Sequence, residues 1–266
     1  MTINVCIAGA TGWVGRSLVP AICAEQDLEL VGAVARTHAG KKVGEVIQQT
    51  SLDLTISGSV QEALKNKCAV LVDYTKPNAV KSHVLEAIKT GAHVVIGTSG
   101  LTDEDFAQIH EQAIEHRVGV LAAGNFAITA VLLQRFAEIA AKYTSCWEIV
   151  DYASEKKVDA PSGTARELAF RLGRVKKPNL YNPIENTQGA KESRGLTLNG
   201  TQVHSLRLPG YTLSVEAIFG LPDEKLIIKH EAGSSAEPYV KGTLLAIRQV
   251  VSFVGLKRGL DSVMEF

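Results

Sequence analysis

The chain has 266 residues, of which 45% are hydrophobic, and its 28 Lys and Arg residues balance 28 Asp and Glu residues. This neutral balance gives no field that would attract nucleic acid or an anionic membrane surface, and no apolar run approaches the ~20 residues of a membrane span. The length predicts one large or two smaller domains. The first residues, MTINVCIAGA, have no basic region, so we expect a first strand and no signal peptide.

The spacing of the cysteines and histidines indicates the cellular compartment and whether a metal site is present. The cysteines, Cys6, Cys23, Cys68 and Cys146, show no CxxC spacing. They are typical of reduced thiols, and we expect a cytoplasmic protein. The seven histidines are scattered, without a pair at ligand spacing, so no metal site is expected.

Strands and helices alternate through the first half of the chain. An apolar strand at Ile3–Ala8 leads through a glycine-containing turn into a helix that continues through Ile22, and a second strand follows at Leu28–Val34. Further strands are expected at Leu52–Ile56, Ala69–Tyr74, His93–Ile96 and Val118–Ala122, with helices at Val60–Lys65, Val80–Thr90 and Asp103–His116. Apolar strands separated by helices predict a parallel sheet covered on both faces, with ligands beyond the carboxyl ends of its strands.

The turn after the first strand carries glycines at GxxGxxG spacing, Gly9, Gly12 and Gly15. The first permits the tight turn, the second lets phosphate approach the backbone, and the third lets the helix pack on the strand. The position between a strand and a helix favours a dinucleotide site. The candidate cofactor-binding residues lie in this turn and at the other strand ends, and they are Gly9, Thr11, Gly12, Trp13, Val14, Gly15, Arg36, Thr37, Tyr74, Thr75, Gly97, Thr98, Gly124, Asn125 and Phe126.

The end of the second strand indicates which dinucleotide is preferred. NAD-preferring proteins usually place Asp or Glu here to bind the ribose 2′-hydroxyl, whereas this chain has Arg36, with Lys41 and Lys42 close behind. A guanidinium can bind a 2′-phosphate in a fork. We therefore predict NADPH as the preferred cofactor, with NADH possible. The alternative is a solvated basic loop, which is common on protein surfaces.

A second motif, KVDAPSGTA, spans Lys157–Ala165 and is followed at once by an apolar helix pattern. Ser162 or Thr164 can cap that helix, and Gly163 lets the backbone approach a ligand closely. Free N–H groups at a helix start bind anions such as a carboxylate, and Lys157 adds a positive charge. The motif predicts that these four residues bind a small carboxylated substrate. An ordinary capped loop is the alternative.

The hydrophobic pattern changes after Phe126. A helix is expected at Thr129–Tyr143, a strand at Glu148–Tyr152, and a polar loop over residues 174–200. Alternating runs at Gln202–Leu208, Leu213–Phe219 and Lys225–Glu231 predict antiparallel strands with one covered face, and Tyr239–Val254 predicts a final helix.

Taken in order, these motifs resemble the dihydrodipicolinate reductase family of lysine biosynthesis. The motifs are the glycine turn at 9–16, VDYTKP at Val72–Pro77, GTSG at Gly97–Gly100, GNF at Gly124–Phe126, KVDAPSGTA, and HSLRLPG at His204–Gly210. The resemblance implies an α/β protein with a Rossmann-type dinucleotide-binding domain, residues 1–126 plus 240–266. It also implies an α+β mixed-sheet domain, residues 127–239, that binds substrate and forms a homotetramer. The implied activity is hydride transfer from NAD(P)H to a small cyclic dicarboxylate.

The chain departs from the family at two places. Family members usually carry a histidine pair before the motif lysine, and the first is the presumed proton donor; counted back from Lys157, these positions hold Ala153 and Ser154. The arginine that the family tends to carry after the last strand is missing from residues 233–238. Lys157 is the best remaining catalytic residue. Possible substitutes for the proton donor are Tyr152, Glu155 and Lys156.

Three functions remain open at this point. The first is an NAD(P)H-dependent reductase that resembles the family but acts on another small carboxylated cyclic imine or enamine. The second is an authentic 4-hydroxy-tetrahydrodipicolinate reductase with a substituted proton donor. The third is a non-catalytic relative that only binds the cofactor. The fold does not separate them, because function depends on the site.

Overall fold

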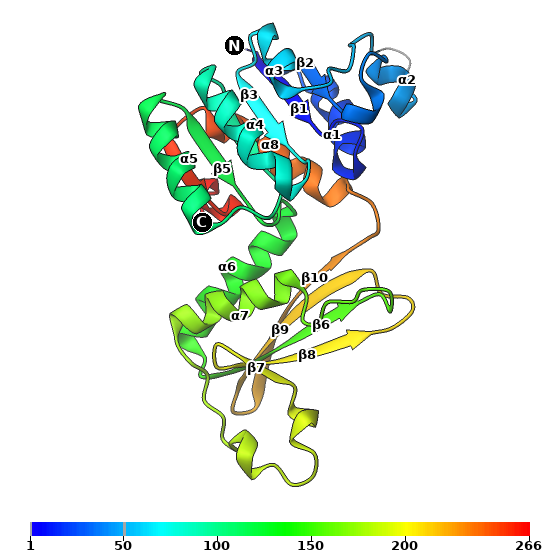
Figure 1. Ribbon diagram of the computed structural model, residues 1–266. Coiled ribbons are helices and arrows are strands. Elements are labelled where there is room, and N and C mark those ends of the chain that lie inside the picture. The colour runs from blue at the N-terminus through cyan, green and yellow to red at the C-terminus, as the bar shows by residue number, and fades with distance from the viewer. Residues whose placement is uncertain (1, 50–51) are drawn as a thin grey trace. The chain divides into compact units, whose positions relative to one another are not determined.

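The computed structural model describes residues 2–49 and 52–266. The chain divides into two compact units, one made of Met1–Ile128 and Ala236–Phe266 and the other of Thr129–Ser235 (Figure 1). The first unit is therefore formed by both ends of the chain, and the second by one continuous segment between them.

The first unit is built on a parallel six-stranded sheet in the order β11-β5-β4-β3-β1-β2. Its strands are β1 (Ile3–Ala8), β2 (Leu28–Val34), β3 (Val70–Asp73), β4 (His93–Ile96), β5 (Gly119–Ala122) and β11 (Gly255–Arg258). Its longer helices are α1 (Trp13–Ala24), α4 (Pro77–Lys89), α5 (Asp103–Glu115) and α8 (Glu237–Val250), and the short ones are α2 (Val43–Ile47) and α3 (Val60–Ala63). Short 3₁₀ segments are η1 (Arg36–His38), η2 (Leu64–Asn66) and η5 (Leu260–Val263).

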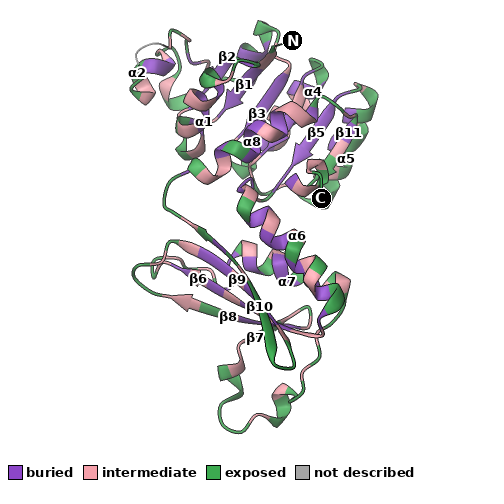
Figure 2. Cartoon of the chain, turned by 180° about the vertical axis from the view of Figure 1, so that it is seen from behind, coloured by how far each residue is buried: buried purple, intermediate pink, exposed green. Residues whose placement is uncertain are grey.

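Helices cover both faces of this sheet, as the sequence predicted. The helices α4 and α5 pack against one face and α1 and α8 against the other, so every residue of β3 and β5 is buried (Figure 2). Local signals set the helix starts: Pro77 occupies the first position of α4, where a missing N–H costs nothing, and Thr102 forms a capping box with Asp105 at α5.

Two expectations for the first unit were wrong. Leu52–Ile56 is not a sheet strand: Thr55 makes only an isolated antiparallel bridge with Lys42, because this segment bonds to the loop after β2 instead of the sheet edge. The last helix ends at Val250, and the chain then forms β11 beside β5. Gly255, with φ +91°, takes a conformation that helix residues do not adopt, which separates the two elements.

The second unit is built on a five-stranded mixed sheet in the order β10-β9-β6-β8-β7. Its strands are β6 (Cys146–Ala153), β7 (Leu196–Leu198), β8 (Thr201–Arg207), β9 (Leu213–Leu221) and β10 (Glu224–Ala232), and its helices are α6 (Ile128–Tyr143) and α7 (Gly163–Val175). The polar segment before β7 holds two 3₁₀ turns, η3 (Ile184–Asn186) and η4 (Lys191–Arg194). Burial alternates along β6, and its buried residues Trp147 and Ile149 join a core shared with α6 and α7.

Strand β8 corrects the expectation that the later strands are all antiparallel. It runs parallel to β6, whereas β9 is antiparallel to both β6 and β10. The two strands are parallel because α7 lies between them in the chain. As a crossover helix, it brings the chain back to the end of the sheet where β6 began. The fold class is confirmed: a Rossmann-like parallel sheet accompanied by a second, mixed sheet.

Candidate functional site

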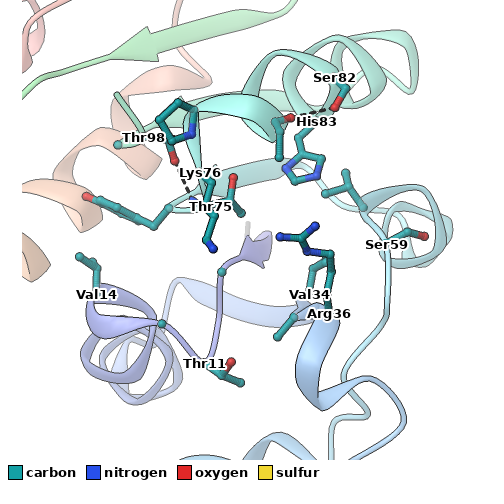
Figure 3. Close-up of a pocket in the computed structure, with 18 of the residues that line it drawn as sticks. Thr11, Val14, Val34, Arg36, Ser59, Thr75, Lys76, Ser82, His83 and Thr98 are labelled. Atoms are coloured by element: carbon teal, nitrogen blue, oxygen red, sulfur yellow. Dashed lines mark hydrogen bonds between the residues drawn. The ribbon is translucent and has the colours of Figure 1, made fainter. Parts of the chain in front are cut away.

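The first unit contains a cavity of about 800 Å³ at the carboxyl ends of its strands (Figure 3). Its walls come from the turn after β1, the end of β2, the start of α3, the ends of β3 and β4, and helix α4. The lining includes ten of the residues singled out in the sequence, namely Gly9, Thr11, Gly12, Trp13, Val14, Arg36, Tyr74, Thr75, Gly97 and Thr98. The strand-end rule therefore located this cavity.

The glycine turn is shaped by close backbone contacts. Gly9 has φ +89°, and a Cβ there would collide with the carbonyl of Tyr74. A Cβ on Gly15 would collide with the carbonyls of Gly9 and Ala10, so Gly15 lets α1 pack closely against the turn. Gly12 precedes α1 with no side-chain cap, and the first turn of the helix carries no acidic residue. The N–H groups at the start of α1 are thus left for a ligand, as a pyrophosphate site requires.

A buried carboxylate organises the floor of the cavity. Asp73, the last residue of β3, has no exposed surface. Its Oδ1 accepts hydrogen bonds from Thr75 N (3.0 Å), Thr75 Oγ1 (2.7 Å) and Thr98 Oγ1 (2.6 Å). Its Oδ2 lies 2.8 Å from His83 Nδ1. Since Thr75, Thr98 and His83 all line the cavity, Asp73 holds three walls of it in place.

Basic side chains face this cavity, although not all of the expected lysines are among them. Arg36, at the start of η1, and His83, on α4, point into the same space (Figure 3). Arg36 has no hydrogen-bond or ion-pair partner within residues 2–49 and 52–266. Lys42 is instead paired with Asp53, Nζ to Oδ1 at 2.7 Å, and neither it nor Lys41 lines the cavity. The positive charge available to a ligand therefore comes from Arg36 and from Lys76, another lining residue.

The other candidate cofactor residues lie outside the cavity lining. Thr37 Oγ1 contacts His38 Nδ1 at 3.2 Å, and Gly15 lies beneath the turn. Gly124, Asn125 and Phe126 follow β5; Asn125 Oδ1 accepts a hydrogen bond from Ala127 N at 2.8 Å. Phe126 is buried and packs edge-on against Tyr74, with ring centroids 5.9 Å apart. Burial raises the pKa of Tyr74, whose hydroxyl lies 2.7 Å from Thr243 Oγ1, so both rings are fixed.

In the second unit, the KVDAPSGTA loop joins β6 to α7. Ser162 caps α7, its Oγ accepting a hydrogen bond from Ala165 N at 3.3 Å. Gly163 and Thr164 are the first two residues of the helix, where backbone N–H groups have no intrahelical acceptor. Lys157 Nζ lies 2.7 Å from Asp159 Oδ1, and this hydrogen bond lowers the pKa of Asp159. The loop thus combines free N–H donors with a lysine held beside it.

The positions before Lys157 lie at the end of β6. Ala153 is completely buried and faces the same side of the sheet as Asp151. Tyr152 faces the opposite side: its hydroxyl lies 3.3 Å from Glu216 Oε2, and Lys229 Nζ is 5.1 Å from its ring centroid. Burial and the charge of Glu216 raise the pKa of Tyr152. Of the substitute donors, Tyr152 is therefore turned away from the face that carries α7.

A buried ion pair lies behind the same loop. Asp151 has no exposed surface, and its Oδ2 lies 2.8 Å from Arg207 Nη2 on β8. The same oxygen accepts a hydrogen bond from Ser162 N at 2.8 Å, and Arg207 Nη2 also donates to the carbonyl of Asp159 at 2.7 Å. One carboxylate, that of Asp151, and one arginine thus connect two strands with the loop.

Sequence reasoning missed several of these residues. Asp73, His83 and Lys76 were not singled out, although Asp73 ends an apolar strand where ligand sites lie. The cavity also includes Ser59 and Gln61 at the start of α3 and Glu86 on α4, none of which was singled out in the sequence. Asp151 had a signal, since a carboxylate on the apolar side of an alternating strand must find a partner.

The described residues contain neither a metal-ligand cluster nor a helix that could cross a membrane. No group of three or more His, Cys, Asp or Glu side chains is arranged to hold a metal ion. Within the same part of the chain, every helix is too short or too polar to span a bilayer.

Two family models cover almost all of the chain. Residues 3–126 match the N-terminal model of dihydrodipicolinate reductase, and residues 129–263 match the C-terminal model of the same family. Curated relatives are similar to this chain over their full lengths. The 4-hydroxy-tetrahydrodipicolinate reductase of Desulfitobacterium hafniense is 36% identical over 99% of both chains. That of Halalkalibacterium halodurans is 35% identical over 99% of this chain and 100% of its own.

The solved structures agree with the family models. A dipicolinate-bound dihydrodipicolinate reductase from Paenisporosarcina sp. TG-14 is 28% identical, with a TM-score of 0.86 over 99% of this chain and 100% of its own. An amine dehydrogenase from Mycobacterium smegmatis, 12% identical with a TM-score of 0.65 over 97% of this chain and 94% of its own, shares the fold alone. With both family models and full-length relatives above 30% identity, the chain belongs to the dihydrodipicolinate reductase family of NAD(P)H-dependent oxidoreductases.

Proposed function

We propose that this protein reduces a small cyclic imine or enamine bearing carboxylate groups, with NADPH as the preferred cofactor. The observation that carries the proposal is the pairing of two sites on one chain: a strand-end cavity with a glycine turn, and a capped helix start beside a lysine. The first suits a dinucleotide and the second a carboxylate. Neither alone would indicate a reductase of this class.

The residues around the cavity fit a dinucleotide. A Cβ at Gly9 or Gly15 would collide with neighbouring backbone carbonyls, so these glycines keep the turn tight against the start of α1, as a dinucleotide-binding turn requires. The start of α1 would bind the pyrophosphate, and Arg36 would bind the 2′-phosphate of NADPH, since it is uncommitted within the described residues and faces the cavity. When bound, the nicotinamide supplies the hydride. Lys42 contributes little to this preference, because Asp53 already neutralises it.

The loop in the second unit would bind the substrate. The N–H groups of Gly163 and Thr164 would donate to one carboxylate, and Lys157 would either exchange Asp159 for that carboxylate or protonate the reacting nitrogen. Ser162 orients the helix start through its cap. Tyr152 is an unsuitable donor because it bonds to Glu216 on the other side of the sheet. Lys157 is thus the residue to which we assign catalysis.

The identity of the substrate depends on the altered positions. The full-length relatives are named for 4-hydroxy-tetrahydrodipicolinate, which makes that compound the first substrate to test. Ala153 and Ser154, in place of the histidine pair that the family resemblance implies, favour a different carboxylated imine instead. A substrate that is already an iminium ion would need no enzyme acid for hydride addition.

The two units would divide these tasks. We assign dinucleotide binding to the unit formed by both chain ends, and substrate binding and assembly to Thr129–Ser235. The half-exposed side chains of β6, including Glu148 and Tyr152, lie on the side of the mixed sheet opposite α6 and α7. A second copy of the chain would cover this face in the homotetramer that the resemblance implies. The cytoplasmic location stays a prediction based on the cysteines, which are all free thiols.

The decisive experiment is to follow NADPH oxidation with 4-hydroxy-tetrahydrodipicolinate and a panel of cyclic imines with and without carboxylates. Turnover that requires a carboxylate supports the proposal. Activity only on the first compound identifies an authentic 4-hydroxy-tetrahydrodipicolinate reductase, and activity on another imine identifies a divergent one. NADPH binding without turnover of any member of the panel would contradict the proposal and indicate a cofactor-binding protein.

A further inference from the structure

The buried pair of Asp151 and Arg207 is poorly explained by stability alone. Along β6 the residues on the side of α7 are Trp147, Ile149, Asp151 and Ala153, so a carboxylate lies in an otherwise apolar row. Buried ion pairs can often be replaced by apolar residues without loss of stability, because desolvation offsets the attraction. Asp151 Oδ1 and Arg207 Nε, both buried, have no hydrogen-bond partner within the described residues. The hydrogen bonds of the pair are thus incomplete, which a contribution to core stability alone does not explain.

The contacts of the pair instead converge on the KVDAPSGTA loop. Arg207 Nη2 bridges Asp151 Oδ2 at 2.8 Å and the carbonyl of Asp159 at 2.7 Å. Asp151 Oδ2 in turn accepts the N–H of Ser162 at 2.8 Å. Arg207 Nη2 therefore holds the start of the segment 159–162, and Asp151 Oδ2 holds its end. Arg207 Nη1 also donates to the carbonyl of Leu206 at 2.8 Å, which holds the guanidinium itself in place.

This clamp decides which backbone donors of the loop are free. Because Ser162 N is bonded to Asp151 and Ala165 N to Ser162 Oγ, the donors left at the helix start are those of Gly163 and Thr164. These two N–H groups lie directly beside the clamped residue, so their direction follows the position of Ser162. An error of about 1 Å in such a site can cost ~100-fold in rate.

We propose that Asp151 and Arg207 are positioning residues, which hold the loop so that the N–H groups of Gly163 and Thr164 are aimed at a substrate carboxylate. The inference rests on the proposed function for the identity of the ligand, but the clamp can be tested without it. A planar guanidinium makes the bridge between two acceptors at fixed angles, which a lysine ammonium does not reproduce.

The test compares Arg207→Met with Arg171→Met in the full chain with NADPH bound. Arg171 is a matched control, since its side chain is 16% exposed against 15% for Arg207, and it pairs with Glu138 between α6 and α7 of the same unit. Hydrogen exchange of the peptide covering residues 158–165 measures how firmly the loop is held. Dipicolinate, the ligand of the similar solved structure, is the binding probe.

We expect Arg207→Met to speed exchange of this peptide and to weaken dipicolinate about 10- to 100-fold, with NADPH affinity unchanged. Substrate KM should rise by a similar factor, and Arg207→Lys should recover part of the loss. Arg171→Met should leave all of these unchanged, even where it lowers the melting temperature equally. Equal loop exchange and equal dipicolinate affinity in the two Met variants would overturn the inference.

Two further outcomes remain distinguishable. Should the wild-type protein bind no dipicolinate and turn over no carboxylated imine, the proposed function fails, while the exchange of the loop still decides whether the clamp exists. Should Arg207→Met not fold, Asp151→Asn provides the same readouts, because the amide keeps an acceptor for Ser162 N but loses the charge that holds Arg207. Normal loop exchange and normal dipicolinate affinity in that variant would also overturn the inference.

Discussion

Replacing Arg36 with alanine should remove most of the preference for NADPH over NADH. Arg36 lines the cavity, and no other described residue takes up its charge, so its guanidinium is available to a 2′-phosphate. A hydrogen bond to a charged group contributes about 1.5–3 kcal/mol, which corresponds to roughly 10- to 100-fold in affinity. Arg36 is exposed to solvent, and salt screens such contacts, so we expect the lower end of this range.

The structure also predicts what Arg36→Ala leaves unchanged. NADH has no 2′-phosphate, so its dissociation constant should stay the same, and the loss should shrink as the salt concentration rises. Lys42→Ala is the matched control, since this lysine is near in sequence but paired with Asp53 outside the cavity lining. Titrating each variant with both cofactors by fluorescence measures the ratio. An unchanged ratio in Arg36→Ala, or an equal fall in Lys42→Ala, would refute the assignment.

Three further predictions concern the second unit. Lys157→Ala should lower turnover on a productive imine by ~10²–10⁴-fold while NADPH affinity stays the same, and unchanged steady-state kinetics would remove Lys157 from the mechanism. If the histidine pair that the family resemblance implies contains the proton donor, wild-type turnover of 4-hydroxy-tetrahydrodipicolinate should be lower by ~10²–10⁴-fold than that of a relative that carries the pair. Because Ala153 is completely buried, Ala153→His should cost about 1–3 kcal/mol of stability without restoring activity. Comparable wild-type turnover would contradict this reading. Burial lowers the pKa of His230, so below about pH 6.5 the unfolded chain takes up a proton that the folded chain resists, and the free energy of unfolding should decrease as the pH falls. In urea unfolding between about pH 7.5 and about pH 5.5, His230→Gln should make this decrease smaller. An equal decrease in both proteins would exclude His230 as its source.

Strands with strong local patterns were predictable, and those defined by their partners were not. Ile3–Ala8 and Leu28–Val34 are continuous apolar runs, and the structure has strands with these bounds. Gly255–Arg258, with the sequence GLKR, has no such pattern and forms a strand because its backbone pairs with β5. Leu52–Ile56 has the pattern of a strand, but its backbone bonds to the loop after β2 and does not join the sheet.

The candidate site divides in the same way. Glycine turns and helix caps are local, so the turn at Gly9 and the cap at Ser162 could be predicted from adjacent residues. The contact of Asp73 with His83 joins a strand end to the next helix, and that of Asp151 with Arg207 joins two strands far apart in the chain. A single sequence carries no direct signal for such pairs, although a charged residue in an apolar strand indicates that a partner must exist.

The interrupted first unit has a consequence for how the chain is made on the ribosome. Helix α8 and strand β11, which borders β5, follow Thr129–Ser235 in the chain, so the parallel sheet stays unfinished until they too have left the ribosome. The segment Thr129–Ser235 is continuous and emerges whole before them. It can therefore fold while β5 still exposes an open edge, which pairs readily with other chains. Truncations that remove β11 should consequently cause aggregation of nascent chains through the open edge of β5.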